Sequence, residues 1–73
     1  MTESQMTAQQ WLERYAAEID APVPTQAEID QVLELAGVAA HASERIAAPV
    51  ATWMAGVKGI SLAEALAAAR KID

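Results

Sequence analysis

The residues best suited to chemistry stand close together in the middle of the chain, at His41, Glu44 and Arg45. On one helix, residues three and four positions apart are neighbours, so the side chain of His41 can meet those of Glu44 and Arg45. An arginine fork beside an imidazole donor is suited to binding a phosphate or a carboxylate. The spacing therefore predicts a candidate interaction or anion-binding site at these three residues.

The same residues also have a structural interpretation, which the sequence favours. A histidine near a helix end commonly hydrogen-bonds a neighbouring carbonyl and holds the turn in place. Arg45 stands where the last carbonyls of a helix need donors, and it could pair with Glu44, Glu34 or Asp30. Both interpretations stay open at the level of sequence.

Catalytic and metal-binding patterns are absent from the sequence. His41 is the only histidine, and Ser43, two residues along a helix, points to another face, so a nucleophile and base cannot pair there. No cluster of ligands has metal-site spacing, and the three glycines are too scattered for a phosphate loop. We expect no enzyme activity, no cofactor, and no catalytic or metal-binding residue.

Composition narrows the function further. The chain has 73 residues, no cysteine, and a formal charge of −5 from ten acidic and five basic side chains. Without cysteine there is no disulfide or thiolate metal site. The acidic balance argues against nucleic acid and anionic membrane surfaces, and leaves a basic protein partner open. No apolar run is long enough to span a membrane and no signal peptide is present, so we expect a cytoplasmic location.

Four helices with short loops account for the sequence pattern, which predicts an all-α fold, a compact four-helix bundle. Three capping boxes mark helix starts, and Pro49 fits the first turn of the remaining helix. Prolines stop the first helix near Ile19, and Gly59 caps the third. The second helix extends to Glu44, and Gly37 inside it suggests a close backbone approach or a bend. Residues 1–6 are expected to be a flexible N-terminus and residues 7–73 a single helical domain. The starts of three helices are predicted at Thr7, Thr25 and Ser61.

The predicted core consists of one apolar stripe from each helix. With no phenylalanine in the chain, the two tryptophans are expected to fill the interior. The third helix should bury its large apolar residues, and the second its own apolar stripe. The positions of these stripes are Trp11, Leu12, Tyr15, Ala16 and Ile19; Ile29, Val32, Leu33, Ala36 and Ala40; Val50, Trp53, Met54 and Val57; and Leu62, Ala65, Leu66, Ala69 and Ile72.

The run from Ala40 to Gly56 resembles the signature of a small uncharacterised actinobacterial family. The similar positions are Ala40-His41, Glu44-Arg45, Ala47-Ala48-Pro49 and Gly56. Members of that family are found beside or fused to molybdenum-cofactor guanylyltransferases. The resemblance implies an accessory role in molybdenum-cofactor (molybdopterin guanine dinucleotide) biosynthesis, and no catalytic residue is carried over from it.

The sequence therefore supports three hypotheses. The first is a non-catalytic interaction domain that docks on a cytoplasmic protein, plausibly a molybdenum-cofactor guanylyltransferase, through His41, Glu44 and Arg45. The alternative is a binder of small anions or nucleotides that uses His41 and Arg45. In the third hypothesis, the corner formed by His41, Glu44 and Arg45 has only a structural role and stabilises the fold. A homodimer is an added alternative, because a core this small leaves an apolar face to cover.

Overall fold

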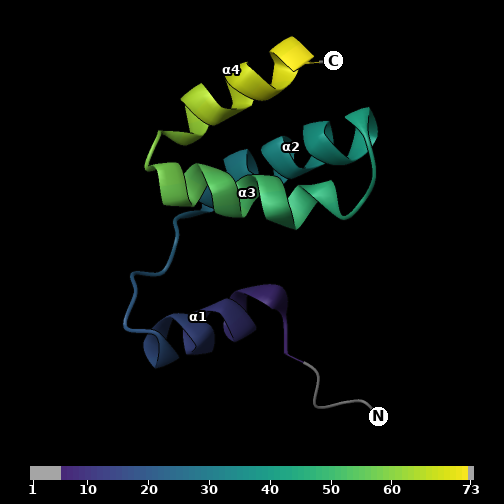
Figure 1. Cartoon of the computed structure of the whole chain (residues 1–73). Coiled ribbons are helices and arrows are strands. Elements are labelled where there is room, and N and C mark those ends of the chain that lie inside the picture. The colour runs from purple at the N-terminus through teal and green to yellow at the C-terminus, as the bar shows by residue number, and fades with distance from the viewer. Residues whose placement is uncertain (1–5, 73) are drawn as a thin grey trace.

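The predicted all-α fold with four helices is confirmed by the computed structural model (Figure 1), which describes residues 6–72. The helices are α1 (Ala8–Glu18), α2 (Gln26–Ala42), α3 (Ala47–Lys58) and α4 (Leu62–Ile72), and the described residues include no strand. The expectation of a flexible N-terminus concerns residues 1–6, which lie outside the described residues except for Met6.

All three predicted capping boxes form. In each, the hydroxyl at the N-cap accepts a hydrogen bond of 3.1 Å from the backbone N–H three residues later. The side chain at that later position accepts from the backbone N–H of the cap, at 2.9, 2.8 and 3.1 Å. Two otherwise unpaired donors are thereby satisfied at each helix start. The pairs are Thr7 with Gln10, Thr25 with Glu28, and Ser61 with Glu64.

Left-handed residues end two of the helices. Gly59, with φ 82°, ends α3 as predicted. Asp20, with φ 57°, follows α1, where the Asp20 N–H donates to the Ala17 carbonyl and the Ala21 N–H to the Ala16 carbonyl. This pair of bonds is a Schellman motif, usually built with glycine. The end of α1 is therefore formed by Asp20, and the prolines that were predicted to end this helix come after it.

The core is centred on α2, which packs against both α3 and α4. Leu35 of α2 is only 3% exposed and lies against Ala55 of α3 and Ala65 of α4, with Leu66 and Ala69 packed on this cluster. Because the contacts from α3 and α4 involve alanines, the helices approach closely with little apolar volume between them. One leucine therefore carries much of the core.

The face that α2 buries differs from the predicted one. Leu33 was predicted to be buried, but it is 63% exposed, whereas Leu35 was left out of the predicted stripe. The reason is that α2 packs against both α3 and α4, and together these two helices cover the side of α2 that carries Leu35. The close backbone approach that was predicted as one alternative for Gly37 is not observed, since a Cβ placed there would meet no atom within 4 Å.

Figure 1 shows α2 and α3 lying between α1 and α4, with α1 joined to α2 by an extended connection. On α1, Ala16 is buried, while Trp11 and Tyr15 stack on each other with their ring centroids 5.0 Å apart. Trp11 remains 51% exposed, so its predicted place in the core is wrong. Among the helices of the described part, none is both long and apolar enough to cross a membrane.

Candidate functional site

The predicted corner lies at the end of α2, which stops two residues earlier than the sequence suggested. Its last residue is Ala42, and Ser43 caps it by donating from both Oγ and N–H to the Ala39 carbonyl, at 2.9 and 3.2 Å. Glu44 and Arg45 therefore lie in the loop before α3. The helical spacing that predicted a meeting of His41 with Arg45 does not apply to a loop residue.

His41, Glu44 and Arg45 are all exposed. Within residues 6–72, none of their side chains makes a hydrogen bond or an ion pair, so the expected bond from His41 to a carbonyl and the expected cap from Arg45 are not formed. Ser43 takes the capping role instead, because its hydroxyl reaches the carbonyl four residues earlier.

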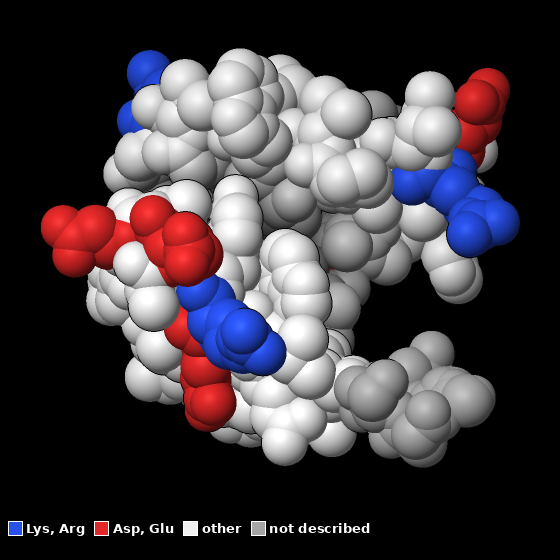
Figure 2. All heavy atoms as spheres, turned by 90° about the horizontal axis from the view of Figure 1, so that it is seen from below, with Lys and Arg blue, Asp and Glu red and all other residues white. Residues whose placement is uncertain are grey.

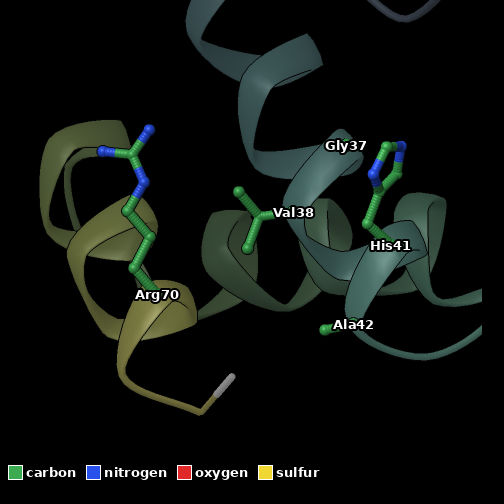
Figure 3. Close-up of a pocket in the computed structure, with 5 residues that line it drawn as sticks. All are labelled: Gly37, Val38, His41, Ala42 and Arg70. Carbon is green, nitrogen blue, oxygen red and sulfur yellow. The ribbon is translucent and has the colours of Figure 1, made fainter.

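His41 shares a hollow with a different arginine. The hollow has a volume of about 470 Å³ and is lined by His41, Gly37, Val38, Ala42 and Arg70. In Figure 3, His41 of α2 and Arg70 of α4 lie on either side of Val38. Local spacing could not have found Arg70, because it stands far along the chain and reaches α2 only through the packing of α4.

Arg70 is already engaged by a carboxylate. Its guanidinium forms an ion pair with Glu34 across the α2–α4 contact, and both side chains are at least half exposed. An exposed pair of this kind contributes about 0.2–1 kcal/mol, so its main effect is on local charge. A carboxylate beside the arginine lowers the attraction of this hollow for an anion.

Glu44 lines a second hollow, of about 370 Å³, together with Ser43, Ile46, Ala47 and Val50. Ile46 and Val50 are exposed apolar side chains at the start of α3. The structure thus separates Glu44 from His41 and joins it to an apolar surface. Sequence reasoning missed this connection because it placed Val50 in the core.

The largest departure from the sequence prediction is the orientation of α3. Its small residues face α2, with Ala55 buried and Ala48 and Ala51 partly covered. Its large apolar residues, predicted to be core, face solvent, and Trp53 is 68% exposed. Close packing against α2 admits alanine and leaves no room for an indole. We call the outward residues Ile46, Val50, Trp53 and Val57 the α3 apolar face.

Figure 2 shows one side of the molecule as largely uncharged surface, with acidic and basic side chains gathered in a few groups. Across residues 6–72, no three histidine or acidic side chains are placed to hold a metal ion.

The sequence matches the model of a domain of unknown function, DUF6457, over residues 3–72. The chain belongs to the DUF6457 family. Comparisons of this DUF6457 domain with curated proteins and with solved structures give no significant match. Its family membership agrees with the predicted resemblance to a small uncharacterised helical family.

Proposed function

We propose that this DUF6457 domain is a non-catalytic interaction domain that binds another protein through the α3 apolar face. The observation that carries the proposal is the exposure of Trp53 together with Val50 and Val57 on α3 and Ile46 at its N-cap. Contiguous exposed apolar patches on small proteins mark sites of association. Tryptophan is also the residue type most enriched among the side chains that dominate binding energy.

The predicted polar corner supplies a rim for this face. Glu44 lines the same hollow as Ile46 and Val50, and Arg45 lies beside it in the loop. An apolar centre with charged groups at its edge is the usual composition of a protein interface. The acidic balance of the chain, −5, favours a partner whose matching surface is apolar with basic groups around it.

We extend the proposal to the partner suggested by the sequence resemblance, a cytoplasmic molybdenum-cofactor guanylyltransferase. This domain would then act as an accessory to molybdenum-cofactor biosynthesis in actinobacteria. The support for this partner is the similarity of the run from Ala40 to Gly56, which includes the corner and most of α3.

Calorimetric titration of a purified guanylyltransferase with this domain tests the proposal. We expect Trp53→Ala to weaken binding about 30-fold, which corresponds to the roughly 2 kcal/mol of a central interface tryptophan. Trp11→Ala is the matched control, because Trp11 is also exposed but lies on α1. If the wild-type domain gives no heat of binding, the guanylyltransferase is not its partner. If both variants weaken binding equally, the α3 apolar face is not the binding site.

A second candidate is the binding of a small anion or nucleotide, as proposed from the sequence for His41 and Arg45. The observation in its favour is the hollow that His41 shares with Arg70, with Arg70 in the role expected of Arg45. Thermal unfolding with inorganic phosphate or a guanine nucleotide tests it. A ligand at 100 times its Kd raises the free energy of unfolding by about 2.7 kcal/mol and so raises the melting temperature. Arg70→Gln should abolish this rise in melting temperature. An unchanged melting temperature would end this candidate.

A further inference from the structure

The four helices do not contribute equally to the packed part of the molecule. Within residues 6–72, α3 and α4 each pack on α2, whereas α1 makes no comparable contact with α2, α3 or α4. Figure 1 shows α1 set apart from the other three helices. The buried cluster draws all its residues from α2, α3 and α4, and these are Leu35, Ala55 and Ala65, with Leu66 and Ala69 packed against them.

The apolar side of α1 lies largely in solvent. Trp11, Tyr15 and Ile19 follow one another at helical spacing, and each is about half exposed. Leu12 is partly covered and Ala16 is buried, but Ala16 lies outside the cluster around Leu35. Most helices in proteins gain their stability by packing an amphipathic face. The rest of the chain gives α1 little of this stabilisation.

The contacts that stabilise α1 are instead local. Its first turn is closed by the capping box of Thr7 with Gln10, and its last turn by the bond from the Asp20 N–H to the Ala17 carbonyl. Trp11 and Tyr15 stack on each other within the same helix. All these contacts are kept when the helix moves as a unit. An isolated helix of 11 residues is nevertheless marginal in water, so little free energy is needed to open α1.

The segment between α1 and α2 is built to allow such movement. Residues 21–25 form neither helix nor strand, and Pro22 and Pro24 have no N–H to donate. No backbone hydrogen bond joins residues 22–24 to any other described residue. A change of dihedral angles in this segment therefore breaks no backbone hydrogen bond, which is what a hinge requires.

We propose that α1 is a hinged arm, which moves on residues 21–24 and opens without unfolding α2, α3 or α4. Its opening brings Trp11 and Tyr15 to new positions while the cluster around Leu35 stays packed. The arm goes beyond the proposed function, because the α3 apolar face belongs to the part of the molecule that stays folded.

Native-state hydrogen exchange of the full chain, followed residue by residue by NMR, tests the proposal. We expect the Tyr15 amide to exchange at least about 10-fold faster than the Leu35 amide, because α1 opens while α2 stays packed. Low concentrations of urea should speed exchange at Leu35 and hardly change it at Tyr15, since the effect of urea scales with the surface that opening exposes. Equal protection of both amides with the same urea dependence would overturn the arm.

Two proline variants at matched positions give a second test. Glu13 in α1 and Gln31 in α2 are both exposed, and each is the sixth residue of its helix. Proline inside a packed helix lowers the folding equilibrium constant about 100-fold, and we expect this of Gln31→Pro. Glu13→Pro should reduce the helical signal in circular dichroism but lower the equilibrium constant, measured by urea unfolding, less than about 10-fold. A loss in Glu13→Pro as large as that in Gln31→Pro would show that α1 folds together with α2–α4, and would overturn the proposal.

Discussion

Truncating two leucines on the same helix separates the observed core from the predicted one. Leu33 and Leu35 both belong to α2, and replacing either with alanine makes the same change in helix propensity. Leu35 is 3% exposed and lies at the centre of the cluster with Ala55 and Ala65, whereas Leu33 is 63% exposed.

The expected magnitudes follow from this difference in burial. Leu35→Ala removes nearly all the contacts of a buried side chain and leaves a cavity, which costs about 2–5 kcal/mol. Leu33→Ala removes a side chain that is mostly in water already, and surface changes of this kind stay within about 0.5 kcal/mol. A domain this small has a total stability of only a few kcal/mol, so Leu35→Ala should be largely unfolded at 25 °C.

Urea unfolding followed by circular dichroism measures both variants against the wild type. Leu33→Ala should keep the wild-type midpoint, while Leu35→Ala should lose most of the cooperative transition. Equal losses in the two variants would refute the assignment of the α2 face, and so would a loss below about 1 kcal/mol in Leu35→Ala.

Three further changes act on local structure and can be measured in the same urea experiment. Gly37→Ala should stabilise the domain by about 0.5–1 kcal/mol, because Gly37 is inside α2 and a Cβ there meets nothing within 4 Å; a destabilised variant would show that another backbone does approach. Asp20→Gly should stabilise it by up to about 1 kcal/mol, because φ is 57° at Asp20; an unchanged midpoint would argue against the Schellman stop. Ser61→Ala should destabilise it by about 1 kcal/mol through loss of the 3.1 Å bond from the Glu64 N–H, and Ala63→Ser, elsewhere in the first turn of α4, is its control.

Local signals in the sequence were sufficient to place the helices. The capping boxes at Thr7, Thr25 and Ser61 depend on residues three apart, and Gly59 needs only its own backbone freedom. The end of α1 at Asp20 was harder to predict, because a non-glycine residue in the left-handed region gives a weak signal beside two prolines.

The faces of the helices could not be predicted in the same way, because they depend on which elements pack together. Apolar periodicity on α3 identifies a stripe that includes Trp53, but it does not say whether that stripe meets α2 or a separate molecule. The neighbour of His41 is Arg70 of α4, which approaches only after α2 and α4 have packed. The sequence was therefore sufficient to place His41 near the end of α2, whereas Arg70 as its neighbour across the hollow could be found only from the structure.

The central claim is that α3 presents its large apolar side chains to solvent in the free protein. Acrylamide quenching of tryptophan fluorescence in the Trp11→Phe variant tests it directly, because Trp53 is then the only tryptophan. The account predicts red-shifted emission and quenching close to that of a short tryptophan peptide, as expected for an indole that is 68% exposed. Blue-shifted emission with weak quenching would place Trp53 inside the core and contradict the account.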